Sequence, residues 1–314
     1  MKRTKAAILC AWLLPLAACA GQDAQVQRHG MDAAVASAAS GPEALTPPPS
    51  SAGGPPLSRC TGEGRQSRCA TLDLRGEWTQ GAGIVGRAEP GSRVVFNNKP
   101  LRVSPFGWFV FGLSREETGP VELRIGSEIF RYDVVSREYA IQKIDGLPSK
   151  MVTPPAAALK QIKLDNQRIG AARAHDTPSE DFITGFIWPV SGTVTGVYGS
   201  QRILNGETKQ PHYGVDIAAV TGTPIKATAA GIVRLARSDV YFTGGTVILD
   251  HGHGLSSTYL HLSRLDVKEG ETVAQGQMIG AVGATGRVTG PHLCFRMNWF
   301  DVRLDPQLML EPAE

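Results

Sequence analysis

Short apolar runs separated by glycine-containing turns fill the chain from Phe186 onward. This alternation of runs and turns restricts the possible folds more than any other sequence feature. The connections are short turns, such as His251-Gly252-His253-Gly254 and Lys268-Glu269-Gly270-Glu271. Runs of this length between such turns are typical of strands. The expected strands are residues 223–228, 231–237, 246–250, 256–261, 272–282 and 292–299. We therefore expect an all-β, mostly antiparallel domain over residues 186–314.

A second β-rich region is expected upstream, over residues 59–150. Its strand candidates are residues 93–96, 101–103, 108–111, 121–125 and 129–135. In the last of these, Phe130 and Tyr132 alternate with Arg131 and Asp133, as in a strand with one buried face. The pattern predicts a small β-sandwich-like domain. Because this region has no cluster of titratable residues, we interpret it as a scaffold or a binding module.

Four aromatic residues of this region could form a sugar-binding face: Trp78, Phe106, Trp108 and Phe109. Aromatic side chains at strand spacing more often belong to a hydrophobic core. Both interpretations remain open at this point.

A helical connector is expected over residues 151–185, between the two β regions. Thr153 could cap the helix, and Pro154-Pro155 suits its first turn, where a missing N–H costs nothing. A narrow apolar stripe follows at Leu159, Ile162 and Ile169. The pattern predicts one helix of roughly 18 residues, which ends before Pro178. It would dock across the two domains or occlude a site.

The first 18 residues read as a secretory signal peptide. Lys2, Arg3 and Lys5 precede an apolar run over residues 6–16, which is too short to cross a bilayer. The run ends in Leu16-Ala17-Ala18-Cys19, which resembles a bacterial lipobox. This resemblance implies cleavage before Cys19 and lipidation of its thiol.

The residue after Cys19 bears on the compartment. By analogy with such lipoproteins, Ala20 favours an outer-membrane lipoprotein that faces the periplasm. The alternative is ordinary cleavage after Ala18 or Ala20, which would release a soluble periplasmic protein. Either outcome places the chain in the cell envelope.

Residues 19–58 have little hydrophobic periodicity and contain a run of proline, glycine and serine, so we interpret them as a linker. The whole chain has a formal charge of +3, and its three positive signal residues account for that excess. The chain without its signal residues therefore has no excess of positive charge with which to attract nucleic acid.

The five cysteines differ by position. Cys10 lies in the signal peptide and Cys19 in the lipobox. Cys60 and Cys69 flank a short polar loop and could form a local disulfide in an oxidising compartment. Cys294 is left without a cysteine partner.

Candidate metal ligands gather in the C-terminal domain, where five of the seven histidines fall between positions 212 and 292. In an extended segment His212 and Asp216 share one face, and so do His292 and Cys294. Imidazole, carboxylate and thiolate are zinc ligand types, and three protein ligands with an open fourth position describe a catalytic site. A lone histidine–aspartate pair would be more often a surface hydrogen bond.

Three ordered motifs make the pattern specific. They are Pro211-His212-Tyr213-Gly214-Val215-Asp216, Tyr259-Leu260-His261-Leu262-Ser263, and Gly290-Pro291-His292-Leu293-Cys294-Phe295. Over about residues 186–310 the chain resembles the M23 family of zinc metallopeptidases, also called LytM-type domains. The resemblance implies a Zn²⁺-dependent endopeptidase that cleaves peptide bonds of bacterial peptidoglycan.

The resemblance also implies roles for five residues. His212 and Asp216 would bind zinc, while His261 and His292 would be catalytic. Cys294 occupies the position of the family's third zinc ligand, which is otherwise a histidine. A thiolate can bind zinc, but its charge makes the metal less acidic. His251 and His253 resemble a turn found often in the family and are left out of the site.

Two further hypotheses stay open. In the first, Cys294 is only a small buried strand residue in a degenerate, metal-free domain, and the protein regulates or activates a cell-wall amidase or division protein. In the second, the chain is chiefly a structural tether of the envelope. The expected partners are peptidoglycan and, if Cys19 is lipidated, a membrane reached through the lipid anchor.

Overall fold

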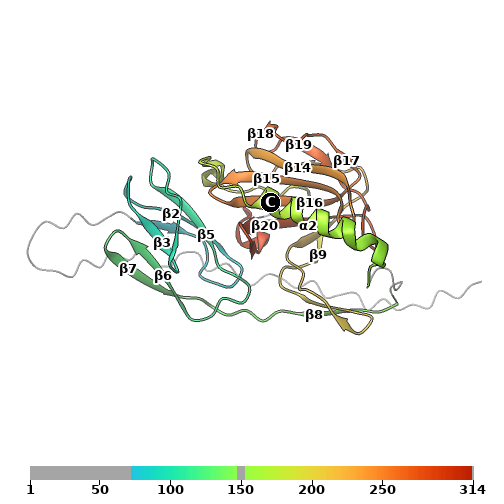
Figure 1. Ribbon diagram of the computed structural model, residues 1–314, viewed down its shortest axis with the longest axis horizontal. Coiled ribbons are helices and arrows are strands. Elements are labelled where there is room, and N and C mark those ends of the chain that lie inside the picture. The colour runs from blue at the N-terminus through green and yellow to red at the C-terminus, as the bar shows by residue number, and fades with distance from the viewer. Residues whose placement is uncertain (1–71, 147–152, 313–314) are drawn as a thin grey trace, which may run out of the picture. The chain divides into compact units, whose positions relative to one another are not determined.

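A computed structural model describes residues 72–146 and 153–312. The predictions for Cys19, Cys60 and Cys69 lie outside these described residues. The described part is mainly β, with small N-terminal sheets, one α-helix and a large C-terminal antiparallel sheet, which confirms the expected fold class (Figure 1). No helix in the described ranges is long and apolar enough to cross a bilayer.

Two small antiparallel sheets form the N-terminal region, in the orders β1-β2-β5 and β4-β3-β6-β7. Their strands are β1 (Asp73–Arg75), β2 (Gly83–Arg87), β3 (Val94–Phe96), β4 (Lys99–Pro100), β5 (Trp108–Gly112), β6 (Pro120–Ile125) and β7 (Glu128–Asp133). Residues 101–103, which we expected to form a strand, lie outside every strand because the pairing of β3 with β4 ends at Pro100.

The aromatic residues of this region divide between core and surface. Trp78 stacks on Tyr132 with ring centroids 3.8 Å apart, and Phe109 is fully buried. Phe106 is exposed, and Trp108 lies beneath the guanidinium groups of two arginines. Because Trp78 and Phe109 belong to the core, the four residues do not form one sugar-binding face.

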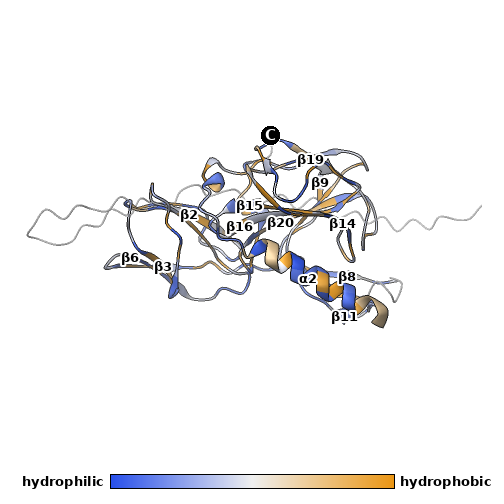
Figure 2. Cartoon of the chain, turned by 45° about the horizontal axis from the view of Figure 1, so that its top comes forward, coloured by the Kyte–Doolittle hydropathy of each residue, from blue (hydrophilic) through white to orange (hydrophobic). Residues whose placement is uncertain are grey.

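The connector is the 15-residue helix α2 (Leu159–Arg173), preceded by the short 3-10 turn η1 (Ala156–Ala158). Neither helix start has a side-chain cap, so the predicted cap at Thr153 is wrong, and the helical turns begin after the two prolines. Ile169 and Ala172 pack on a small apolar cluster with residues of two C-terminal strands. Figure 2 shows hydrophilic and hydrophobic residues following one another along α2.

The C-terminal sheet has the order β18-β14-β15-β16-β20-β12-β9, with β21 paired to β20, and all of its pairs are antiparallel. Its strands are β9 (Thr193–Gly196), β12 (Val215–Ala218), β14 (Gly231–Val240), β15 (Gly244–Gly252), β16 (Leu255–Leu262), β18 (Thr272–Val273), β20 (His292–Trp299) and β21 (Val302–Leu304). A second sheet contains β13 (Pro224–Lys226), β19 (Met278–Ala281) and β17 (Arg264–Leu265). The predicted strand over 272–282 is thus two strands, because a turn separates β18 from β19.

A third small sheet was not predicted from the sequence. In it β8 (Ile141–Ile144) runs parallel to β10 (Gln201–Leu204), and β10 pairs with β11 (Glu207–Thr208). Two further 3-10 turns, η2 (Asp181–Thr184) and η3 (Pro306–Leu308), complete the described elements. The pairing brings a segment from before the helix next to a strand that precedes the first histidine of the site.

The described residues all fall in one compact unit, with a hydrophobic core that includes residues of both β regions. Phe96 meets Trp299 edge-on with ring centroids 6.4 Å apart. Arg137 makes an ion pair of 2.8 Å with the buried carboxylate of Asp305. The N-terminal sheets are therefore packed on the C-terminal domain through both apolar and charged contacts.

Candidate active site

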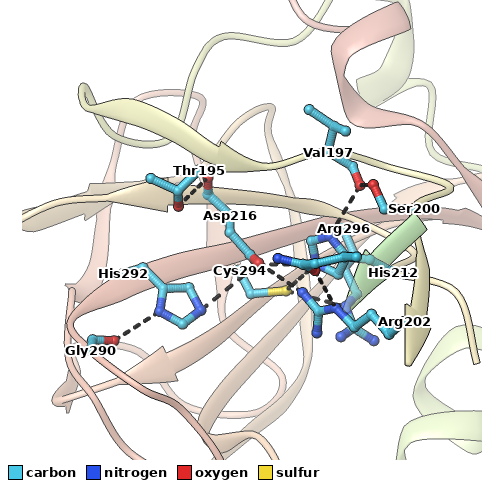
Figure 3. Close-up of polar contacts among 11 residues, drawn as sticks. Thr195, Val197, Ser200, Arg202, His212, Asp216, Gly290, His292, Cys294 and Arg296 are labelled. Atoms are coloured by element: carbon cyan, nitrogen blue, oxygen red, sulfur yellow. Dashed lines mark hydrogen bonds and ion pairs between the residues drawn. The ribbon is translucent and has the colours of Figure 1, made fainter. Parts of the chain in front are cut away.

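The structure brings the five predicted site residues together on adjacent strands. Asp216 on β12 lies directly opposite Cys294 on β20, so the two side chains share a face. His292 begins β20, two residues before Cys294 and on the same face, and His212 lies three residues before β12 (Figure 3). His261 comes from β16, the other neighbour of β20.

The side chain of His261 reaches the site through an irregular backbone. The pairing of β15 with β16 shifts register between Tyr259 and Leu262, and His261 has a left-handed φ of 69°. Bulges and left-handed residues of this kind re-aim side chains and are enriched at functional sites. As a result, the ring of His261 lies 4.9 Å from that of His292 between centroids.

Three donor atoms are close enough to share one metal ion. His212 Nε2 lies 3.0 Å from Asp216 Oδ1 and 3.5 Å from Cys294 Sγ, and all three donors lie within 4.8 Å of one another. Zinc with tetrahedral ligands at about 2.0–2.3 Å needs donors about 3.3–3.8 Å apart. The chemistry and spacing of this donor set therefore fit a zinc ion with small adjustments.

All three site histidines are held by a hydrogen bond at Nδ1, and His212 and His292 turn Nε2 toward Asp216. Their Nδ1 atoms lie 3.3, 2.9 and 2.9 Å from backbone oxygens of Val197, Thr285 and Gly290, for His212, His261 and His292 respectively. A carbonyl can only accept, so each Nδ1 carries the proton and donates it. In the neutral ring Nε2 then has a free lone pair, which can bind a metal or accept a proton.

Asp216 stays ionised in its partly buried position. Burial alone would raise its pKa, but the hydrogen bond and charge of His212 together with Arg202 lower the pKa well below the usual range. Arg202 Nη2 donates to Oδ2 at 3.0 Å, while Oδ1 faces His212 and His292. Arg202 thus holds the carboxylate by one oxygen and leaves the other for a metal.

The surroundings of His212 and His261 shift the pKa values of the two rings in opposite directions. Burial works against protonation of His212, but its hydrogen bonds to Asp216 and Cys294 outweigh burial and raise its pKa in the metal-free site. Burial lowers the pKa of His261 to about 4, so that ring is neutral at physiological pH. A neutral His261 can accept a proton at Nε2.

Cys294 is buried and has a charged neighbour that our sequence reasoning missed. Arg296 Nε lies 3.5 Å from its Sγ, two residues along the same strand face. Burial opposes the charge of Arg296, yet Cys294 and Asp216 raise its pKa above the usual value. Strand alternation could have placed Arg296 beside Cys294, whereas nothing in the sequence signals the contact between Arg202 and Asp216.

His251 and His253 lie outside the centre, as the sequence indicated. His251 Nδ1 donates to the oxygen of Ala230 at 2.6 Å, and its Nε2 lies 2.8 Å from Ser257 Oγ. His253 sits in the turn between β15 and β16 with a φ of 52°. Burial lowers the pKa of both rings, so both are neutral structural groups.

The site opens into a cavity of about 650 Å³, which is lined by His212, Asp216, His261, His292 and Cys294 together with residues of α2 and β21. This volume is typical of a small-molecule or peptide site. The helix that the sequence placed between the domains therefore forms part of the cavity wall.

Comparison with known proteins agrees with this geometry. Residues 210–306 match the family model described as peptidase family M23. The peptidoglycan DD-endopeptidase ShyA of Vibrio cholerae is 44% identical over 98 residues, which cover 31% of this chain and 23% of the relative. The cell division protein DipM of Caulobacter vibrioides is 33% identical over 165 residues, which cover 52% of this chain and 25% of the relative. The chain thus spans about a quarter of these relatives' length.

A solved structure matches a larger part of the chain. The chain is similar to the crystal structure of a candidate M23 peptidase from Pseudomonas aeruginosa, with 31% sequence identity and a TM-score of 0.57. The match covers 74% of this chain and 94% of that one. It therefore extends well beyond the segment that carries the three motifs.

Proposed function

The chain belongs to peptidase family M23, and from that premise we propose that it is a zinc-dependent endopeptidase that hydrolyses peptide bonds of bacterial peptidoglycan. One observation carries the proposal: three donor atoms of zinc-ligand type lie within 4.8 Å of one another, beside two histidines whose rings are in contact. Relatives named as peptidoglycan DD-endopeptidases support the substrate class.

In this proposal His212, Asp216 and Cys294 hold the metal. A bound zinc ion supplies Lewis-acid polarisation of a peptide carbonyl and lowers the pKa of a water molecule. The protein's own contribution begins with Arg202, which holds Asp216 in place by its second oxygen. The backbone oxygen of Val197 does the same for His212 by accepting a hydrogen bond from its Nδ1–H group.

His261 and His292 perform the proton transfers. Each ring is fixed by an Nδ1 hydrogen bond to a backbone carbonyl, so Nε2 is the reactive atom. A neutral Nε2 accepts a proton from the attacking water, and the resulting cation can return it to the leaving amine. The low pKa of His261 keeps this ring unprotonated before the reaction.

Arg296 compensates for the thiolate at the third ligand position. A thiolate adds a negative charge that a histidine would not, and that charge makes a zinc centre less acidic. The guanidinium of Arg296 beside Sγ offsets part of this charge. The exchange of histidine for Cys294 is therefore compatible with catalysis.

The second candidate function is that of a regulator with the same fold but without peptidase activity. Cys294 and its contact with Arg296 are consistent with a degenerate domain that regulates a cell-wall amidase, and the match to a protein named for cell division favours this alternative. The retention of His212, Asp216, His261 and His292 in one geometry favours the enzyme.

The experiment that tests the proposal measures metal and activity together. Protein purified without added metal should contain zinc and cleave purified peptidoglycan, and a chelator should abolish both properties. Zinc-free wild-type protein that leaves peptidoglycan intact but stimulates a purified amidase would establish the regulator instead.

We further propose that the protein acts in the cell envelope as an outer-membrane lipoprotein, lipidated at Cys19 and with a Cys60–Cys69 disulfide. The lipobox-like sequence and the two flanking cysteines support this proposal. Intact-mass analysis of membrane-extracted protein, with and without reduction, tests both modifications; an unmodified Cys19 would remove the anchor.

A further inference from the structure

Beyond Cys294 and Arg296, the same face of β20 continues into a polar region that the proposed chemistry does not use. Four side-chain atoms there are buried without a hydrogen-bond partner: Arg173 Nε, Ser256 Oγ, Asn298 Oδ1 and Arg303 Nη1. Buried polar atoms in folded proteins are nearly always paired, so such a group points to a missing water, ion or ligand.

Strand register and one hydrogen bond place these atoms side by side. Arg296 lies opposite Thr258, and Asn298 lies opposite both Ser256 and Arg303. From the end of α2, Arg173 Nη2 donates to Thr258 Oγ1 at 3.3 Å. Arg173, Arg296 and Arg303 therefore form one group, which we call the arginine cluster.

The arginine cluster adjoins the metal centre. Arg296 is two residues from Cys294 on one strand face, a separation of about 6.6 Å along the strand. All three arginines line the same cavity as the metal ligands. A peptide bound at the centre would reach the cluster within one or two residues, because its own residues advance by a similar distance.

The cluster holds more positive charge than the protein neutralises, because Cys294 faces Arg296 alone. Among the described residues, no ion pair within 4 Å involves Arg173, Arg296 or Arg303. Burial lowers the pKa of Arg173 well below its usual value, and repulsion from the other two adds to this effect. Burial and Arg296 likewise lower the pKa of Arg303, despite the attraction of Asp301.

The remainder of the cavity does not supply the missing anion. Six basic residues line it against two acidic ones, Asp165 and Asp216. Asp216 is engaged by His212 and Arg202, and Asp165 accepts hydrogen bonds from Gln161 and the backbone of Tyr241. A helix C-terminus favours one nearby cation, which explains Arg173 alone but not three guanidinium groups.

We propose that the arginine cluster binds a free carboxylate of the substrate peptide, located within one or two residues of the bond that is cut. Guanidinium groups hold carboxylates in paired, charge-assisted hydrogen bonds, which match the unpartnered donors of Arg173 and Arg303. The inference rests on the proposed peptidase function and adds substrate selection to it. Arg173 lies outside the segment matched by the family model, so the connector helix contributes to this selection.

The test uses two synthetic stem-type peptides that differ in one group, a free carboxylate or a carboxamide beside the scissile bond. Cleavage by the zinc-loaded protein gives kcat/KM for each, and calorimetry on chelator-treated protein gives binding without turnover. We expect the carboxylate peptide to be favoured by about 10- to 100-fold in both measurements, since hydrogen bonds to charged groups have effects of this size.

Variants assign the preference to the cluster. Arg173→Gln and Arg303→Gln should reduce the preference to within about threefold, whereas Arg264→Gln, which removes an exposed arginine paired with Asp266, should leave it unchanged. Arg303→Lys keeps the positive charge but lacks the planar guanidinium that pairs with a carboxylate through two hydrogen bonds. This variant should therefore fold and still lose most of the preference for the carboxylate peptide.

Each outcome decides the inference. Equal use of the two peptides by wild-type protein overturns it, and so does tight binding of inorganic phosphate with no discrimination between the peptides. If neither peptide is cleaved but the carboxylate peptide binds selectively, the carboxylate site stands and the peptidase function fails.

Discussion

At the scale of single residues, each candidate zinc ligand presents one donor atom to the proposed metal site. Asp216 offers Oδ1 to the centre because Arg202 occupies Oδ2, and His212 offers Nε2 because its Nδ1–H donates a hydrogen bond to Val197 O. Cys294 Sγ is shared between the centre and Arg296. Substitutions at this position therefore test whether the thiol is a ligand or only a buried side chain.

Cys294→His should keep zinc, at about one ion per chain, because imidazole is also a zinc ligand. Cys294→Ala should lose most of the metal, since two protein ligands hold zinc weakly at neutral pH. Elemental analysis of dialysed protein checks both variants. Full zinc content in Cys294→Ala would show that the thiol is no ligand, provided that circular dichroism confirms a wild-type fold.

His261→Ala and His292→Ala should separate catalysis from metal binding. Each variant should retain zinc but lose turnover by about 10²-fold or more, because a positioned proton-transfer group contributes this much. Peptidoglycan cleavage and zinc content are measured on the same samples. Loss of zinc from either variant would argue that the ring is a ligand.

Zinc affinity should fall as the pH drops. The raised pKa of His212 in the metal-free site means that a proton competes with the metal up to a pH above the usual histidine value of 6.5. Below that pKa each further pH unit should weaken apparent binding by about tenfold or more. Competition with a coloured chelator between pH 5 and 8 measures the slope; a flat profile would exclude His212 as a ligand.

At the scale of elements, three neighbouring strands deliver the site and tight turns set their register. β12 and β16 flank β20, and the turn after β15 begins β16 in register with its partner. Gly252 in this turn has a φ of 97°, and a Cβ there would overlap the backbone oxygen of Ser179. A side chain at this position would displace the turn that anchors β16.

Gly252→Ala should lower stability by about 3 kcal/mol or more, because a left-handed φ and a backbone clash both oppose the methyl group. Gly222→Ala is the matched control. Its φ is 94° but a Cβ would meet nothing within 4 Å, so we expect a loss of about 1 kcal/mol. Denaturant unfolding compares the stability of the two variants. Equal losses of stability would mean that the backbone at Ser179 moves away from the new methyl group at no cost in free energy.

At the scale of the whole molecule, the β-rich N-terminal region and the C-terminal domain share one core. Leu304 and Trp299 of the C-terminal sheet lie against Gly112, and the Arg137–Asp305 ion pair joins residues 168 positions apart. Asp305 is almost fully buried, so removal of either partner would leave an unpaired charge.

The described part of the chain should therefore unfold as one cooperative unit. Scanning calorimetry with saturating chelator should give one transition, with calorimetric and van't Hoff enthalpies in agreement. Two resolved transitions would contradict the shared core. Asp305→Ala, which breaks the ion pair, is expected to shift the transition downward without splitting it.

The sequence alone predicted the candidate site residues and the type of their scaffold. Alternation along β20 placed His292 and Cys294 on one face, and glycine-rich turns indicated antiparallel strands, because both signals depend on residues close together in the chain. The expected strand over 101–103 and the helix cap at Thr153 were wrong, because pairing partners and not local propensity decide such boundaries.

Only the tertiary structure decided which charges surround the site. Arg202 reaches Asp216 through a small sheet that contains β8, and Arg173 meets Arg296 and Arg303 across 123 and 130 residues of chain. Such contacts depend on how distant elements pack, which neither spacing nor periodicity encodes. The sequence therefore determined which groups can bind zinc, whereas packing decided the positive charge that surrounds them and, through it, the substrate that we expect the site to select.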